Sequence, residues 1–221
     1  MASPPPEDVR RPTLPAGLER LLHDLRGPLN SAVMHLEVVK RAGVDDPLAK
    51  QSLETIGQEL VRLARMLPAA FSVAALDRNE MVVVDLRSTV EQELRRQGAA
   101  SVRLLGSEWP RVRGDAELLT VAASHLIRNA LEATEAAGPG RPTPTVTAES
   151  TDGRVALLVR DYGTGMRNPR VAIRLAASQK PGRTGIGLVT VERIARLHGG
   201  TLALSTPPDG GIEARLTLPG A

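Results

Sequence analysis

The sequence predicts an α+β protein in which a two-helix hairpin is followed by an α/β sandwich. Between residues 18 and 74, apolar side chains recur at alternating spacings of four and three, which is typical of long amphipathic helices. Beyond residue 77, short β-branched runs alternate with shorter helical patterns, which indicates a sheet covered by helices. We therefore divide the chain into a flexible Pro-rich tail at 1–16, the hairpin at 17–78 and the sandwich domain at 79–221.

Composition narrows the class of function. Aromatic residues make up only 1% of the 221 residues, so the stacking platforms that bind single-stranded nucleic acid are missing. The net charge of +3 comes from basic residues interspersed with acidic ones, which is typical of a solvated surface. The absence of cysteine excludes disulfides and a thiol nucleophile. Since no apolar run approaches the roughly 20 residues of a membrane span, we expect a soluble cytoplasmic protein that binds neither nucleic acid nor membrane.

Two matching apolar seams predict the hairpin. The first seam consists of Leu18, Leu22, Leu25, Leu29, Ala32, Leu36 and Val39. The second consists of Leu53, Ile56, Leu60, Leu63, Leu67, Ala70 and Ala74. Between them, Asp46 is a predicted N-cap and Pro47 a first helical residue. One hairpin leaves much of each seam uncovered, whereas two hairpins about a twofold axis close a four-helix bundle, so we predict a homodimer.

Apolar runs separated by glycine predict the elements of the sandwich. Strands are expected at 81–86, 101–105, 143–149, 154–161, 201–205 and 212–218. Helices are expected at 87–97, at 116–137 with Asp115 as its cap, and at 186–198, where Gly199 ends the helix. The short segment 77–80 between the two domains is the expected hinge.

A candidate nucleophile lies on the first helix. Leu22, Leu25 and Leu29 face the seam, so His23 and Asp24 lie outside it. A neutral imidazole can attack a phosphoryl group through one nitrogen while a neighbouring acceptor, here Asp24, holds the proton on the other. Pro28 removes a helical hydrogen bond nearby at a cost on the order of 3 kcal/mol, which predicts a bend beside His23.

Three further groups of residues have the chemistry of a nucleotide site. His125 and Asn129 share one helix face, and an amide oxygen there can ligate the Mg²⁺ that a nucleotide carries. Asp161 ends a strand and can accept a hydrogen bond from an adenine amino group. The glycines that follow let backbone approach a ligand. The predicted phosphate site at the start of the last helix includes Lys180, Thr184, Gly185, Ile186, Gly187 and Leu188.

Taken together, these motifs resemble the histidine-kinase family of two-component systems. The motifs are H-D-x-R-x-P-L from His23, N-A at Asn129, D-x-G-x-G from Asp161 and G-x-G-L from Gly185. Asp85-Leu86, Asp115 and His198-Gly199-Gly200 also look like family features. The resemblance extends from residue 18 to the C-terminus. It implies a dimerisation and histidine-phosphotransfer hairpin followed by an ATP-binding domain of the GHKL type.

The resemblance also implies roles and partners. His23 matches the phosphorylated histidine, Asp24 its acidic neighbour, Asn129 the Mg²⁺ ligand and Asp161 the adenine contact. The matching loops around ATP contain Gly163, Gly165, Gly185 and Gly187. The implied cofactors are ATP and Mg²⁺, and the implied partner is a response-regulator receiver domain whose aspartate takes the phosphoryl group. A separate sensor or input protein is expected to supply the signal.

The chain departs from the family pattern at several positions. His125 stands where the first Asn of the N box is commoner, Ser178-Gln179-Lys180 matches a family Thr-Thr-Lys segment only loosely, and Arg183 replaces a glycine. Gly27 stands where many relatives carry Thr or Asn, which predicts weak phosphatase activity.

Two alternatives remain open. The first is a histidine phosphotransfer adaptor or pseudokinase that does not use ATP, and the second is a related ATPase or serine kinase. Of the other histidines, His35 is read as a surface residue and His198 as a cation at a helix C-terminus, neither with a catalytic role.

Overall fold

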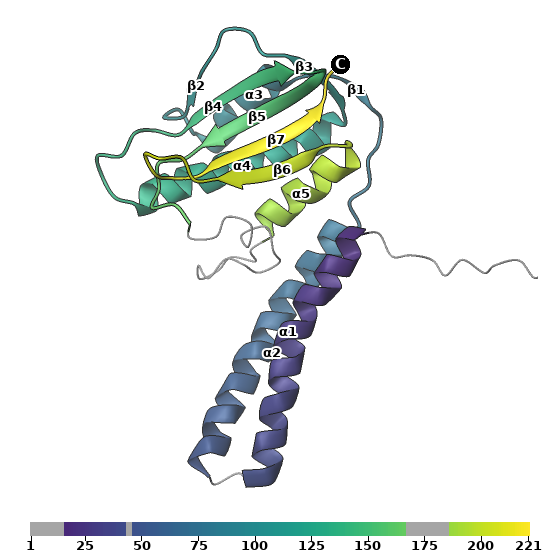
Figure 1. Cartoon of the computed structure of the whole chain (residues 1–221), viewed down its shortest axis with the longest axis vertical. Helices are drawn as coiled ribbons and strands as arrows, with labels where there is room; N and C mark the ends of the chain where they lie inside the picture. Colours follow the sequence, from purple (N-terminus) through teal and green to yellow (C-terminus); the bar gives the residue numbers. More distant parts are fainter. Residues whose placement is uncertain (1–15, 43–45, 167–185) are drawn as a thin grey trace, which may run out of the picture. The chain divides into compact units, whose positions relative to one another are not determined.

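The computed structural model describes residues 16–42, 46–166 and 186–221. Contacts divide the chain between Ala64 and Arg65 into two compact units. The first unit holds the hairpin except for the last turns of its second helix, and the second holds the sandwich (Figure 1). The predicted α+β fold, with a helical hairpin and a sandwich, is confirmed. In the part of the chain that the structure describes, no helix is both long and apolar enough to cross a membrane.

The hairpin consists of α1 (Ala16–Ala42) and α2 (Pro47–Ala74), which run side by side (Figure 1). The predicted helix start is confirmed, because Asp46 Oδ1 accepts a hydrogen bond from the Leu48 amide at 2.7 Å and Pro47 is the first helical residue. A polar contact joins the two helices, with 3.4 Å between His35 Nδ1 and the hydroxyl of buried Ser52. His35 is therefore half-buried in the hairpin rather than a surface residue.

Each hairpin helix contains a proline. Pro28, from which the sequence predicts a bend, lies inside α1 and is buried. Sequence reasoning missed Pro68, which lies inside α2 and cannot donate to the carbonyl of Ala64. One turn later, the hydroxyl of Ser72 donates to the carbonyl of Pro68 at 2.9 Å. Both helices thus lose one backbone hydrogen bond part of the way along.

Much of the apolar surface of the hairpin unit is exposed in the single chain. Leu29 is 51% exposed, Val33 53%, Met34 61% and Leu60 53%. Further exposed apolar residues of this unit are Leu22, Leu36, Leu48, Leu53 and Val61. Two of the four, Leu29 and Leu60, belong to the predicted seams, and contact between α1 and α2 leaves them uncovered.

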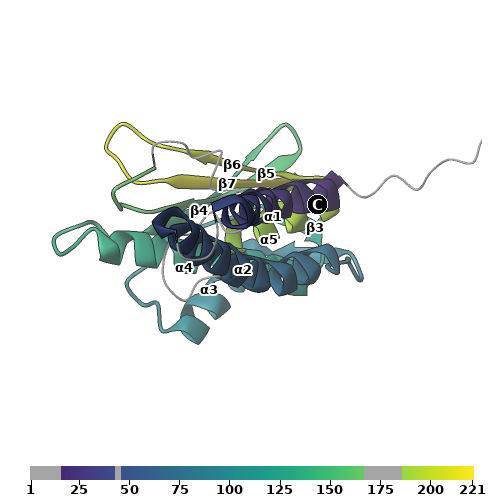
Figure 2. The same ribbon diagram turned by 90° about the horizontal axis from the view of Figure 1, so that it is seen from below.

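The sandwich has a five-stranded sheet in the order β2-β4-β5-β7-β6. Its strands are β2 (Arg103–Leu104), β4 (Thr145–Thr151), β5 (Arg154–Arg160), β6 (Thr201–Ser205) and β7 (Glu213–Pro219). Helices α3 (Leu86–Gln97), α4 (Ala116–Ala136) and α5 (Gly187–Leu197) lie on one face of the sheet (Figure 2). The core lies between these layers, where Leu157 and Leu216 of the sheet belong to the same buried cluster as Leu126 and Ile194 of the helices.

A second, two-stranded sheet pairs β1 (Val82–Asp85) with β3 (Arg111–Gly114) in antiparallel register. The sequence predicted β1 but not β3. In β3 only Val112 is a large buried apolar side chain, and arginines flank it. Val112 pairs with Val84 on one side and forms a bridge with Gly220 on the other. Long-range pairing rather than local pattern therefore produces this strand.

Asp115 and His198 join the start of α4 to the end of α5. Asp115 Oδ1 accepts from the amides of Glu117 and Leu118, which confirms the predicted cap. His198 Nδ1 lies 2.7 Å from the carbonyl of Ile194, and its Nε2 accepts from the amide of Asp115 at 2.9 Å. Nδ1 must therefore carry the proton and Nε2 must be bare. His198 is a buried, neutral tether, so its interpretation as a helix-end cation is wrong.

The predicted hinge segment 77–80 is bound to the sandwich at its two middle residues. The guanidinium of Arg78 donates to the carbonyl of Leu197 at 3.0 Å. The amide of Asn79 donates to Asp115 Oδ2 at 2.8 Å. Just before the segment, Arg193 donates to the carbonyl of Leu76 at 3.1 Å. Bending within this segment therefore has to break hydrogen bonds to α4 or α5.

Candidate functional site

The polar face of α4 meets the first residue of α5. A Cβ built on Gly187 would lie 3.3 Å from His125 Nδ1 and 3.7 Å from Asn129 Nδ2. The structure thus brings two separate predicted motifs together at one place. Among the described residues, no side chain caps the start of α5, so its first backbone N–H groups are donors for an anionic ligand. Glycine at position 187 lets the two helices approach this closely.

The turn after β5 is fastened to the other end of α4. The amide of Tyr162 donates to the hydroxyl of Thr134 at 3.1 Å. Gly163 packs on the helix so closely that a Cβ there would lie 2.7 Å from the carbonyl oxygen of Ala133. Gly165 has a positive φ of 75°, which glycine adopts without strain. Two of the glycines predicted from the sequence are therefore required by local geometry.

Asp161 sits at the start of this turn as a buried carboxylate. Its Oδ1 accepts from the amide of Gly163 at 2.9 Å and from the amide of Ile212 at 3.1 Å. Burial raises the pKa of Asp161, and these two backbone donors only partly oppose that effect. Among the described residues, both hydrogen bonds go to the same oxygen. Oδ2 is therefore available to accept from a ligand amino group.

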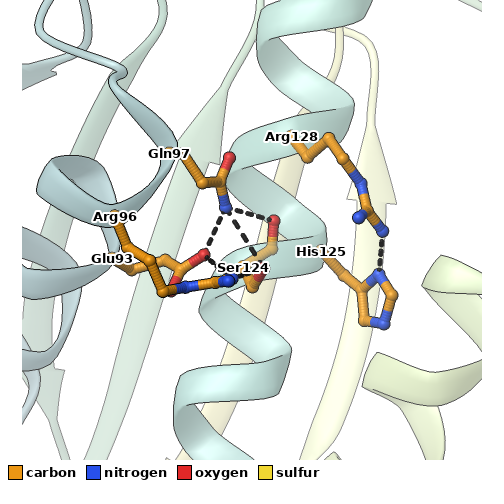
Figure 3. A network of polar contacts seen from close by, with 6 residues as sticks. All are labelled: Glu93, Arg96, Gln97, Ser124, His125 and Arg128. Atoms are coloured by element: carbon orange, nitrogen blue, oxygen red, sulfur yellow. Dashed lines mark hydrogen bonds and ion pairs between the residues drawn. The ribbon is translucent and has the colours of Figure 1, made fainter.

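A polar network lies beside the site on α3 and α4 (Figure 3). Glu93 is buried and accepts from Arg96 and Gln97, and both of these donors also reach Ser124 of α4. The next residue, His125, accepts at Nδ1 from the Arg128 guanidinium at 2.7 Å. Burial, with the positive charge of Arg128, lowers the pKa of His125 to about 4. His125 is thus uncharged at neutral pH.

The structure describes some predicted site residues and not others. His125, Asn129, Asp161, Gly163 and Gly165 lie along α4 and the turn after β5. Ile186, Gly187 and Leu188 form the start of α5. Lys180, Thr184 and Gly185 lie outside the described residues. The backbone of α1 includes His23 and Asp24, but the structure does not describe the positions of their side chains.

Sequence reasoning missed Arg128 and Thr134. Arg128 follows His125 by three residues, and that spacing on a helix was a usable signal. Thr134 acts only through a backbone amide from a distant turn, for which the sequence carries no local signal.

The polar groups of this site, which include an amide oxygen, open backbone N–H groups and a carboxylate, suit a nucleotide with its magnesium ion. Mg²⁺ keeps several waters and binds phosphate oxygens together with one or two protein oxygens. The side-chain amide of half-buried Asn129 can provide such an oxygen next to the open helix start at Gly187. Oδ2 of Asp161 can provide an acceptor for an amino group of the base. The arrangement defines the chain as a nucleotide-binding α/β sandwich joined to a helical hairpin.

Comparison with known proteins agrees with this class. Residues 114–221 match the family described as Histidine kinase-, DNA gyrase B-, and HSP90-like ATPase. The sensor histidine kinase MtrB of Mycobacterium tuberculosis is 31% identical over 217 residues, covering 89% of this chain and 37% of MtrB. The chain thus spans little more than a third of that relative, and 27% of the sensor protein DivL of Caulobacter vibrioides.

Two solved structures extend the comparison. The ATP-binding domain of PrrB from Mycobacterium tuberculosis has 25% sequence identity and a TM-score of 0.52, covering 65% of this chain and 99% of that one. Full-length ShkA shares the fold over 95% of this chain and 46% of its own, with 22% identity and a TM-score of 0.54. Residues 114–221 thus form an ATP-binding domain of the GHKL type, and the comparisons together support a two-component histidine kinase.

Proposed function

We propose that the chain is an ATP-dependent protein-histidine kinase that phosphorylates its own His23 and passes the phosphoryl group to an aspartate of a response-regulator receiver domain. One observation carries the proposal. His125 and Asn129 of α4 lie directly against the start of α5 at Gly187, while the far end of the same helix holds the turn of Asp161. Hydrogen-bond donors for the phosphates and an acceptor for the adenine base therefore lie beside the same helix, α4.

In this proposal Asp161 receives the adenine amino group and the start of α5 receives the phosphates. Asn129 would hold Mg²⁺, whose positive charge would stabilise the charge that develops on the phosphates during transfer. Full-length ShkA, which shares the fold, was solved in complex with AMPPNP. Lys180, Thr184 and Gly185 are proposed as further phosphate contacts on the evidence of their motif.

The transfer step is a displacement at the γ-phosphorus. One ring nitrogen of His23 attacks, an N–P bond forms, and the bond from the γ-phosphorus to the β–γ bridging oxygen breaks, so that ADP leaves. Asp24 holds and then accepts the proton of the other ring nitrogen. Most of the acceleration in such reactions comes from positioning and charge stabilisation.

A homodimer is part of the proposal. Two hairpins that associate about a twofold axis cover the exposed apolar side chains of α1 and α2, of which Leu29, Val33 and Leu60 are all more than half exposed in the single chain. The receiver domain and a separate input protein are proposed as the other partners, following the role of sensor kinases among the relatives.

Incubation with γ-labelled ATP and Mg²⁺ tests the activity. We expect acid-labile label on the chain and on an added receiver domain, and none on His23→Ala. His35→Ala is the matched control, because His35 is a second histidine of α1 whose contact is Ser52; this variant should keep the label. Label that persists in His23→Ala refutes the acceptor assignment.

Nucleotide binding separates the proposal from its alternative. His23→Ala should bind Mg·ATP like the unaltered chain, whereas Asn129→Ala should bind it more weakly only when Mg²⁺ is present. A chain that binds ATP and acquires no label is a pseudokinase, and one that does not bind ATP is a phosphotransfer adaptor.

A further inference from the structure

The protonation of His125 is fixed by its neighbour on α4. The Arg128 guanidinium has donors and no acceptor, and one of its terminal nitrogens lies 2.7 Å from His125 Nδ1. Nδ1 therefore accepts this hydrogen bond and cannot carry a proton. A neutral imidazole has one N–H group, so the proton must be on Nε2. Figure 3 shows Nε2 on the edge of the ring that faces away from Arg128.

Arg128 is held by no acid in the described part of the chain. Glu93, the carboxylate that faces this region from α3, is already occupied by Arg96 and Gln97. From α5 the residue that packs against the ring is Gly187, which has no side chain. Among the described residues, the Arg128 side chain donates its hydrogen bond to His125. The guanidinium is thus free to hold the ring.

These contacts decide what the ring can do next to a nucleotide. The lone pair on Nδ1 is occupied, so the ring cannot act as a general base through that nitrogen. The other nitrogen already carries a proton, so it cannot accept one either. The ring, whose Nδ1 lies 3.3 Å from the place of a Cβ on Gly187 at the helix start, can donate one hydrogen bond from Nε2 on its other side, and such an N–H donor is suited to a phosphate oxygen.

We propose that Arg128 is a positioning residue that holds His125 as the Nε2–H tautomer, so that the ring offers an uncharged N–H donor to the nucleotide phosphates. The donor role rests on the proposed nucleotide site, whereas the tautomer rests on the geometry of α4 alone. His125 on this basis is a binding residue and not the base of the reaction. Base function stays with Asp24 beside the acceptor histidine.

Nuclear magnetic resonance of the full chain tests the tautomer without nucleotide. With ¹⁵N-labelled histidine, the four histidines give ring correlations that distinguish Nε2–H from Nδ1–H, and His125→Gln identifies the signals of His125. We expect the Nε2–H form for His125 and a mixture of both forms in Arg128→Ala. His198 is an internal reference of the opposite kind, because its Nδ1 bears the proton.

Binding of Mg·AMPPNP to the full chain tests the donor role by a double-mutant cycle. Glutamine at position 125 keeps an N–H donor at a similar reach and has no tautomers. Arg128→Ala should weaken binding about tenfold beside His125, the order of one hydrogen bond to a charged acceptor. Beside His125→Gln the same substitution should weaken binding less than about threefold.

Arg95→Ala is the matched control for loss of one positive charge. Arg95 is an exposed arginine of α3, and its removal should leave both the tautomer and the affinity unchanged. An Nδ1–H tautomer in the unaltered chain overturns the proposal. Equal losses from Arg128→Ala in both backgrounds also overturn it, because Arg128 then acts on the nucleotide or the fold directly. A chain with the Nε2–H form that binds no Mg·AMPPNP refutes the donor role and the proposed function, but leaves the hold of Arg128 on the ring standing.

Discussion

Replacing Glu93 by glutamine tests how much the contact between α3 and α4 depends on a buried charge. Glu93 is 1% exposed. Burial alone raises the pKa of a carboxyl group, but hydrogen bonds from Arg96, Gln97 and Ser124 prevail and lower it from 4.5 to about 2. At about 1.36 kcal/mol per pH unit, this difference is worth roughly 3 kcal/mol. Because the Arg96 side chain is 67% exposed, solvent screening reduces the figure to on the order of 2 kcal/mol.

The sign of the pH dependence follows from the lowered pKa. The folded chain holds the ionised form of Glu93 more tightly than the unfolded chain does. The stabilisation is therefore complete above the unfolded pKa of 4.5 and disappears as the pH falls towards about 2. More than half of it should be lost between pH 7 and pH 3. Glutamine at position 93 cannot ionise, so the two proteins should approach each other in stability at low pH.

Urea unfolding followed by tryptophan fluorescence is the assay. Trp109 is the single tryptophan of the chain and packs against the core of the sandwich, so it reports this unit and not the hairpin. Glu91→Gln is the control on the same helix, because its pair with Arg87 is partly exposed and should be worth less than about 1 kcal/mol. A loss at Glu93→Gln as small as the control, or a loss that does not shrink at pH 3, refutes the reasoning.

Three further substitutions test packing at other places. Gly163→Ala forces a methyl group against the carbonyl of Ala133 and should cost about 1–3 kcal/mol, measured by the same urea assay; an unchanged midpoint contradicts this. His198→Ala leaves the buried amide of Asp115 without its acceptor and should cost about 3 kcal/mol by that assay, a value that an unaffected midpoint would rule out. Pro68→Ala restores a helical hydrogen bond in α2 and should stabilise the helix by up to about 3 kcal/mol, seen as a higher melting temperature by circular dichroism; a lower one would show that the proline is required.

Local pattern was enough for most elements of the fold. The strand expected at 201–205 has those bounds as β6 (Thr201–Ser205), and the expected helix at 87–97 begins one residue earlier as α3 (Leu86–Gln97). In both segments the apolar residues recur with a regular period, and a residue that ends the element follows. Strand β3 has neither a periodic pattern nor a stop signal. Its single large buried apolar residue, Val112, is placed in a strand by its pairing with Val84 and its bridge to Gly220. A strand made by pairing alone cannot be read from its own residues.

The candidate site divides in the same way. The places of Asn129 on a helix and of Asp161 at a strand end were predictable, because the patterns of α4 and β5 are visible in the sequence. The neutral state of His198 was not predictable, because it follows from the carbonyl of Ile194 and the amide of Asp115. Backbone groups of this kind are the same at every position, so nothing in the sequence identifies the ones that will meet a ring nitrogen.

Helix α4 joins the linker to the nucleotide site within one rigid element. At its start, Asp115 accepts the amide of Asn79 from the linker. In its middle, Asn129 lies against Gly187, and near its end Thr134 holds the turn of Asp161. A helix of 21 residues spans about 31 Å at about 1.5 Å per residue, and its hydrogen bonds resist bending over that length. A displacement of the start of α4 relative to β5 and α5 therefore also displaces Asn129 and Thr134, which lie at the two parts of the candidate nucleotide site.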